Sequence, residues 1–247
     1  MPGVRQLLPE PAEIDPFEAH AGADRPPPPG RPWMALNMVA SADGATSVDG
    51  VSESLGGPAD FEVFKAIRAV ADVIVAAAGT VRAEGYGPPK PSKAVQAARL
   101  ARGQTRVPRL AVVSRTLELD EHSAMFTEAD EPPLVFTTDD PPADRVAALE
   151  PVADLRAAGP GSVDFSAMAA ILGELGVRCA VVEGGPALNG QLLAADLVDE
   201  LNLTIAAVLA GGPSKRVVVS DVEAVHPLAL AHLWESDGHL LARYVRG

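Results

Sequence analysis

The feature that most constrains the fold is a series of short apolar runs that alternate with segments of helical character. Residues 33–40, 72–78, 110–113, 134–136 and 177–182 are apolar at nearly every position. A strand with apolar side chains on both faces must be covered on both faces, as in a parallel sheet between two layers of helices. We therefore predict an α/β fold with a mainly parallel central sheet and helices on both of its faces.

Two segments between these runs carry helix signals. Pro58 suits the first turn of a helix, and Ser162 or Asp164 can cap a second helix that reaches Leu175. In the first helix, apolar side chains recur at three-residue steps, at Phe61, Phe64, Ile67 and Val70. We expect that face to pack against the sheet.

The two ends of the chain differ from the middle. Residues 1–30 are rich in proline and end in four prolines and a glycine, so we predict an extended arm outside a single domain at 31–247. Apolar residues alternate at 201–205, in a strand expected to end at Gly211-Gly212, and 230–245 has the pattern of two strands around a turn. An antiparallel C-terminal hairpin is expected at one edge of the sheet.

Composition excludes several classes of protein. A chain of 247 residues with 47% hydrophobic content can bury a full core, and its net charge of −13 opposes nucleic-acid binding. Cys179 is the single cysteine and no histidine pair has helical metal-ligand spacing, so we expect no metal site. No apolar run reaches the roughly 18 residues of a membrane span. We predict a cytoplasmic protein without a nucleic-acid or membrane partner.

A glycine turn after the last buried run indicates a cofactor site. Gly184-Gly185-Pro186 follows the strand, so backbone without Cβ atoms meets the start of a helix. The free N–H groups there attract an anion such as a nucleotide phosphate. A strand-to-helix turn that binds nothing has the same residues. The order strand, glycine, hydroxyl and arginine also occurs at 79–82.

Missing motifs narrow the choice of enzyme. The chain has no dinucleotide-binding Gly-x-Gly-x-x-Gly after its first strand, no P-loop and no Gly-x-Ser-x-Gly, which disfavours Rossmann dehydrogenases, P-loop NTPases and serine hydrolases. Ser114-Arg115 ends a predicted strand. A hydroxyl beside a guanidinium suits the 2′-phosphate of NADP, whereas an acidic residue would favour NAD.

Three motifs in order resemble the reductase domain of bacterial riboflavin-biosynthesis pyrimidine reductases, which has the dihydrofolate reductase-like fold. They are NMVASADG at 37–44, DVIV with GTVRAE at 72–84, and EGGP with LN and LVDEL at 183–201. The resemblance spans about 31–246. It implies a homodimer that uses NADPH to reduce a small heterocyclic substrate, 5-amino-6-(5-phosphoribosylamino)uracil, with hydride delivered to the ribosyl C1′ carbon.

The resemblance also implies which residues form the site. Contacts near the nicotinamide would come from Val39, Thr80, Val81 and Glu84. The pyrophosphate turn would consist of Gly184, Gly185, Pro186, Ala187, Leu188 and Asn189, and the 2′-phosphate would be held by Ser114 and Arg115. Residues facing the substrate would be Ser52, Arg68 and Glu183. A second resemblance, to the dihydrofolate reductases, adds Asp60, and Asp60 and Glu183 are the catalytic candidates.

The chain departs from the family pattern after Glu84. The family commonly has an Asp-Asp-Pro-x-Leu-Thr-x-Arg segment there, whereas this chain reads EGYGPPK, so Lys90 or Lys93 is the candidate replacement for the arginine. The zinc deaminase motifs often fused to this domain are missing. Residues 55–64 resemble the start of the dihydrofolate reductase helix, whose acid contacts the pterin, so Asp60 is a candidate general acid if burial raises its pKa. A pterin reductase and a cofactor-binding module without turnover stay open as alternatives.

Overall fold

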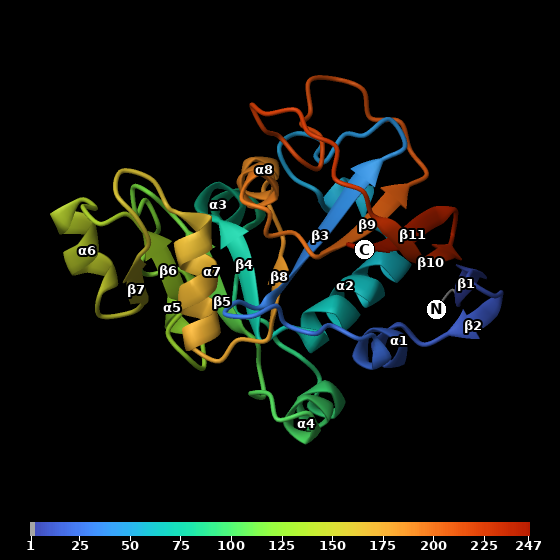
Figure 1. Ribbon diagram of the computed structural model, residues 1–247, viewed down its shortest axis with the longest axis horizontal. Helices are drawn as coiled ribbons and strands as arrows, with labels where there is room; N and C mark the ends of the chain where they lie inside the picture. Colours follow the sequence, from blue (N-terminus) through green and yellow to red (C-terminus); the bar gives the residue numbers. More distant parts are fainter. Residues whose placement is uncertain (1–2) are drawn as a thin grey trace.

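One eleven-stranded sheet runs through the computed structural model, which describes residues 3–247 (Figure 1). Its strand order is β2-β1-β10-β11-β9-β3-β8-β4-β5-β6-β7. The parallel part consists of β9 (Glu200–Ala206), β3 (Trp33–Ser41), β8 (Cys179–Val182), β4 (Val73–Ala77), β5 (Arg109–Val113), β6 (Leu134–Thr137) and β7 (Asp154–Ala157). The antiparallel edge consists of β11 (His239–Val245), β10 (Ala229–Ser236), β1 (Val4–Leu8) and β2 (Ala12–Ile14). The predicted α/β class with a mainly parallel sheet is confirmed.

Successive residues of the central strands face opposite layers of helices. Ile74 and Val181 belong to one core cluster, whereas Val75 and Val182 belong to the other. The first layer contains α2 (Pro58–Val70) and α3 (Ala78–Glu84), and the second contains α7 (Phe165–Glu174) and α8 (Pro186–Ala194). The remaining helices are α1 (Pro16–Gly22), η1 (Glu53–Leu55), α4 (Lys93–Ala101), α5 (Ala124–Thr127) and α6 (Ala143–Leu149). None of the helices described at 3–247 combines the length and hydropathy needed to span a membrane.

Local signals account for the start of these elements. The Asp164 carboxylate accepts hydrogen bonds from the Ser166 and Ala167 amides at 2.8 and 3.1 Å, which caps α7 as predicted. The β10–β11 turn has positive φ at Asp237 and Gly238, the conformation that hairpins of right-handed twist favour. The predicted C-terminal hairpin is therefore confirmed.

The N-terminal segment differs from its prediction. Strand β1 pairs with β10, β2 pairs with β1, and α1 packs against α2, so the prediction of an extended arm is wrong for residues 4–22. Helix α1 starts at Pro16, after the Asp15 carboxylate that accepts from the Phe17 and Glu18 amides. This Asp-Pro signal is readable in the sequence. The prediction gave more weight to the proline-rich composition of the segment than to this helix signal.

The buried face of α2 also differs from its prediction. Ile67 of the predicted face is buried, but Phe61 is 58% exposed, and the other buried residues of the helix are smaller, at Ala59, Val63, Ala66 and Ala69. The rings of Phe61 and Phe64 stack with centroids 6.2 Å apart. Alanines let the helix approach the sheet closely, which leaves both aromatic rings outside the core.

The strand predicted to reach Gly211-Gly212 ends earlier. Strand β9 stops at Ala206, and residues 207–228 form a long loop that leads to β10. Both glycines have positive φ, 63° and 69°, which is incompatible with a strand. The chain instead crosses above the carboxyl ends of the parallel strands (Figure 1).

Candidate functional site

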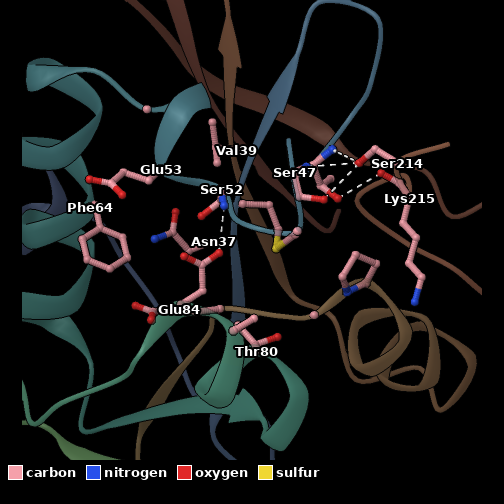
Figure 2. Close-up of a pocket in the computed structure, with 18 of the residues that line it drawn as sticks. Asn37, Val39, Ser47, Ser52, Glu53, Phe64, Thr80, Glu84, Ser214 and Lys215 are labelled. Atoms are coloured by element: carbon pink, nitrogen blue, oxygen red, sulfur yellow. Dashed lines mark hydrogen bonds between the residues drawn. The ribbon is translucent and has the colours of Figure 1, made fainter. Parts of the chain in front are cut away.

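A cavity of about 810 Å³ lies where β3, β4 and β8 run toward their carboxyl ends. This is the edge at which ligands bind in parallel α/β sheets. Figure 2 shows Phe64 and Glu53 at one end of the cavity and Ser214 and Lys215 at the other, with Thr80 below Ser52 and Val39. The cavity is therefore an elongated site that runs from α2 to the 207–228 loop.

A clamped carboxylate forms part of the wall. The two oxygens of Glu183 accept hydrogen bonds from Arg68 Nε and Nη2, both at 2.7 Å, and Oε2 also accepts from the Tyr86 hydroxyl at 2.6 Å. Burial and the Glu183 carboxylate raise the pKa of Tyr86 well above its ordinary value, so this phenol stays a donor. Glu183 is 8% exposed and lines the cavity. The cluster presents one oriented, acceptor-only group to a ligand.

The glycine turn lies against this carboxylate. A Cβ at Gly184, where φ is +83°, would lie 3.2 Å from Met38 Sδ, and one at Gly185 would lie 3.0 Å from Thr80 Oγ1. Glycine is needed here because the turn passes close to two residues of the wall. Helix α8 begins at the next residue, Pro186, which also lines the cavity. The positive end of the helix dipole therefore lies at the site.

A second carboxyl group, Asp60, lines the cavity from the first turn of α2. Burial raises its pKa, although a hydrogen bond to the Thr204 side chain and the nearby His239 oppose that effect. No lysine or arginine among residues 3–247 forms an ion pair with it. Asp60 is thus a half-buried carboxyl that no lysine or arginine of the described residues neutralises.

Half of the sixteen predicted site residues line this cavity. The cavity is lined by Val39, Ser52, Asp60, Thr80, Glu84, Glu183, Gly185 and Pro186. A Glu84 carboxylate oxygen accepts from the Ser52 amide at 2.8 Å, which joins α3 to the loop that precedes α2. Arg68 lies behind the wall and reaches the site through Glu183.

Other predicted residues lie outside the cavity. Val81 and Leu188 are buried in the two core clusters, and Ala187 is exposed. Asn189 is fully buried and donates to the Val217 carbonyl at 2.9 Å, so its side chain holds the 207–228 loop against α8. Gly184 contributes the backbone beside Met38, as described above.

The predicted 2′-phosphate residues lie at the carboxyl end of β5, which is separated from β8 by β4. Ser114 is buried, whereas Arg115 is exposed and its guanidinium bonds to no residue in the described part of the chain. Lys90 pairs with Glu128 at 2.9 Å, and neither it nor Lys93 lines the cavity. Their placement does not support either lysine as a replacement for the family arginine.

Several residues that line the cavity were not predicted from the sequence as site residues. They are Asn37, Thr46, Ser47, Phe64, Tyr86, Ser214 and Lys215. Lys215 is the one lysine or arginine among the lining residues at 3–247. Its loop is held by the Ser214 hydroxyl, which accepts from the Thr46 and Ser47 amides at 3.2 and 3.1 Å. Only Tyr86 carried a readable signal, because it falls where the chain departs from the family motif.

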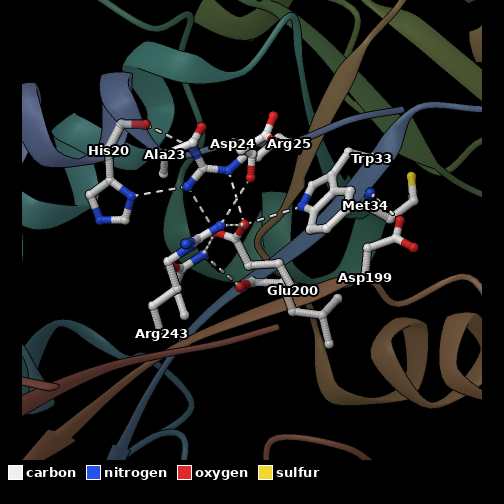
Figure 3. Close-up of polar contacts among 11 residues, drawn as sticks. His20, Ala23, Asp24, Arg25, Trp33, Met34, Asp199, Glu200 and Arg243 are labelled. Atoms are coloured by element: carbon white, nitrogen blue, oxygen red, sulfur yellow. Dashed lines mark hydrogen bonds and ion pairs between the residues drawn. The ribbon is translucent and has the colours of Figure 1, made fainter. Parts of the chain in front are cut away.

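A different carboxylate cluster lies away from the cavity, at the start of β9 (Figure 3). Glu200 is 0% exposed and accepts from Arg25 Nε and Nη2 and from Arg243 Nη2, each at 2.9 Å. Trp33 Nε1 and Asn202 Nδ2 donate to it at 3.1 and 2.9 Å. Burial raises the pKa of Glu200, but the two arginines outweigh that effect and bring it to about 2. The cluster fastens the N-terminal segment, through Arg25, to the sheet.

Comparisons with known proteins agree with this architecture. Residues 32–241 match the family described as the RibD C-terminal domain. Two archaeal relatives are each described as a 2,5-diamino-6-ribosylamino-4(3H)-pyrimidinone 5′-phosphate reductase. The one from Methanothermobacter thermautotrophicus is 28% identical over 199 residues, which cover 81% of this chain and 88% of the relative. The one from Archaeoglobus fulgidus is 27% identical over 189 residues, which cover 76% and 86%.

A solved structure has the same arrangement. The crystal structure of a pyrimidine reductase-like protein from Corynebacterium diphtheriae superimposes with a TM-score of 0.80 at 27% identity, covering 94% of this chain and 98% of that chain. The riboflavin biosynthesis reductase Rib7 of Saccharomyces cerevisiae has the same fold, with a TM-score of 0.67 at 20% identity and coverage of 94% and 97%. The predicted dihydrofolate reductase-like fold is thereby confirmed. Since the family match extends over most of the sequence, this chain belongs to the RibD C-terminal domain family.

Proposed function

We propose that this protein is a nicotinamide-dependent reductase that acts on a ribosylaminopyrimidine 5′-phosphate of riboflavin biosynthesis. The observation that carries the proposal is that one cavity is lined by both the glycine turn of α8 and the clamped carboxylate of Glu183. Relatives of similar length are described as reductases of such a pyrimidine phosphate. Those descriptions favour a pyrimidine substrate over the pterin alternative.

The wall fits a nicotinamide cofactor. Thr80, Gly185 and Pro186 surround the start of α8, where backbone without Cβ atoms and the helix dipole suit a pyrophosphate. Lys215, which lines the same cavity as Pro186, adds the positive charge that an anion needs in a chain of net charge −13. When bound, the cofactor supplies the hydride. Val39 and Glu84 would line its nicotinamide end.

In the proposed reaction the substrate gains hydride at C1′, its C1′–O4′ bond breaks and O4′ takes up a proton. Positive charge develops at C1′ as that bond weakens. Glu183 follows β8 directly and lies beside the glycine turn, so its fixed carboxylate can stabilise that charge. Arg68 and Tyr86 would act as positioning residues that hold both oxygens of Glu183. Ser52 would lie on the substrate side of the wall.

We propose NADPH as the hydride donor, because Arg115 is exposed and free of partners in the described part of the chain. Arg115→Ala should weaken NADPH binding by about 10- to 100-fold, since a charge-assisted hydrogen bond contributes about 1.5–3 kcal/mol. NADH binding should be unchanged. Calorimetric titration of both cofactors checks this, with Arg106→Ala as the control because that exposed arginine precedes β5. Equal losses for the two cofactors would remove the 2′-phosphate assignment.

The test of the function is oxidation of NADPH by the purified protein in the presence of one candidate substrate at a time. We expect oxidation with a ribosylaminopyrimidine 5′-phosphate, offered in its 2-amino and its 2-oxo form. Oxidation with dihydrofolate alone would assign the protein to the pterin reductases. Binding of NADPH without oxidation by any of the three would leave a cofactor-binding module.

The homodimer, implied by the resemblance, and the cytoplasmic location, expected from the lack of a long apolar run, stay predictions. Large apolar side chains are exposed on the 207–228 loop, including Leu209 at 82% and Val225 at 93%. Exposed apolar side chains that gather in one region are common at protein interfaces. Sedimentation of the purified protein at two concentrations measures its oligomeric state directly.

A further inference from the structure

Asp60 carries a carboxyl group that forms no ion pair within the described part of the protein. The Thr204 side chain and His239 lie near it and favour its ionised form, but no lysine, arginine or histidine among residues 3–247 forms an ion pair with it. Removing a carboxylate from water without a cationic partner costs free energy, so buried carboxylates are usually paired or used. Its position on the cavity wall points to a ligand that brings its own hydrogen-bond donors.

The backbone beside Asp60 keeps one of its oxygens accessible. A Cβ on Gly56 would lie 2.9 Å from Asp60 Oδ2, so a side chain at position 56 would crowd that oxygen or displace the carboxylate. Gly56 has φ −77° and ψ 164°, which all residues adopt, so the glycine is not required by the backbone. Its lack of a side chain serves access to the carboxylate.

Asp60 also lies where a flat ring can be held. Phe64 is four residues further along α2, on the same face of the helix, and Figure 2 shows it at the end of the cavity opposite Lys215. Phe61 and the Gly57-Pro58 turn line the same end. A heterocycle that stacks against Phe64 would present its edge to the carboxylate.

The two forms of the substrate differ at that edge. A 2-amino-4-oxopyrimidine carries a ring N–H beside an exocyclic NH₂, and these parallel donors match the two oxygens of a carboxylate. The uracil form has a carbonyl oxygen in place of the amino group. That oxygen would repel one carboxylate oxygen and leave it unpaired.

On the basis of the proposed function, we infer that Asp60 selects the 2-amino form of the ribosylaminopyrimidine phosphate over the 2-oxo form. The two archaeal relatives are described as reductases of this 2-amino form, whereas the sequence resemblance implied the uracil form, and the inference assigns the choice between them to Asp60. The product keeps its amino group, and a separate hydrolytic deamination has to follow the reduction. Asp60 thereby becomes a specificity-determining residue, and Glu183 remains the carboxylate at the reacting carbon.

The test is to measure binding of the two ribitylaminopyrimidine phosphate products, 2-amino and 2-oxo, by calorimetry with NADP⁺ present. The wild type should bind the 2-amino product at least about 100-fold tighter, because a site built for a donor rejects an analogue that lacks it. Asp60→Asn should abolish or reverse this ratio. The amide offers one acceptor and one donor, which match the N–H and C=O of uracil.

Two further variants separate this role from a structural one. Gly56→Ala keeps every charge but crowds Oδ2 or displaces the carboxylate, so it should weaken binding of the 2-amino product about 10-fold or more. Glu62→Gln makes the same carboxylate-to-amide change on α2 outside the cavity wall, and its ratio should equal that of the wild type. Equal wild-type affinities, or an equal loss of both in Asp60→Asn, would overturn the inference.

The binding ratio does not depend on turnover. Selective binding without oxidation of NADPH by either substrate would overturn the reductase proposal and leave the role of Asp60 standing. Oxidation of NADPH with both substrates, together with equal affinity for the two products, would support the reductase proposal and overturn the role of Asp60.

Discussion

Two buried carboxylates, Glu183 and Glu200, have similar partners and opposite surroundings. Each is held by an arginine through two hydrogen bonds and by an aromatic donor, Tyr86 in one case and Trp33 in the other. Glu183 follows the carboxyl end of β8 and lines the cavity, whereas Glu200 opens β9 and is 0% exposed. The end of the strand on which a clamped carboxylate lies therefore decides whether a ligand can reach it.

The number of donors reinforces this difference. An ionised carboxylate has about four acceptor sites. Arg243 and Asn202 add to the Arg25 and Trp33 contacts of Glu200, so its oxygens are saturated by the protein. Glu183 receives three hydrogen bonds and keeps an acceptor site toward the cavity. Saturation indicates a structural role, and the spare acceptor site of Glu183 is what the proposed function uses.

The largest effect that would sharpen this comparison is expected for Glu200→Ala. The change leaves Arg25 and Arg243 buried without their counter-charge, which should lower the free energy of unfolding by about 3–5 kcal/mol. Urea denaturation measures the loss. Glu128→Ala, which removes the exposed partner of Lys90, should cost under about 1 kcal/mol. A loss for Glu200→Ala as small as that of the control would contradict its structural role.

The next effect concerns the other carboxylate. Glu183→Gln keeps an oxygen for Arg68 but removes the charge beside the reacting carbon, so turnover should fall by about 100-fold or more. The free energy of unfolding should change by less than about 2 kcal/mol, because the Arg68 side chain is 21% exposed and can reach water. Initial rates of NADPH oxidation and urea denaturation together check this. A variant that loses more than about 2 kcal/mol of unfolding free energy and keeps its turnover would erase the distinction between the two clusters.

The sequence predicted the part of the fold that is specified locally. Continuous apolar runs identified β3, β4, β5, β6 and β8, because each of these strands is buried on both faces. Strand β1 was not predicted, because Val4 is its one buried residue and its pairing partner β10 lies more than two hundred residues later in the chain. Its stability comes from a distant edge, which no local pattern records.

The same distinction applies to the site. Thr80, Glu183 and Gly185 directly follow predicted strands, so the parallel-sheet rule placed them correctly on the cavity wall. Lys215 reaches the wall because the Ser214 hydroxyl accepts hydrogen bonds from the amides of Thr46 and Ser47. These two residues lie 168 and 167 positions earlier in the chain. Loop-to-loop contacts of that kind have no sequence periodicity. The family resemblance supplied motif residues, and the structure was needed for the rest.

The last effect is an acid dependence on the Glu200 side of the molecule. Burial, and then the charge of Arg25, lower the pKa of His20 from 6.5 to about 3, and burial lowers the pKa of the adjacent His232 to about 4, so the unfolded state binds more protons than the folded state below pH 6.5. The stability that neutral His20 contributes is complete above pH 6.5 and is lost below it at about 1.4 kcal/mol per pH unit. Hydrogen exchange should therefore show β1 and α1 losing protection at pH 5 before β8 and α8 do. His122→Gln, which changes an exposed histidine, is the control and should keep this order. If β1 and α1 lose protection at the same pH as β8 and α8, the two regions unfold as one cooperative unit and the prediction is wrong.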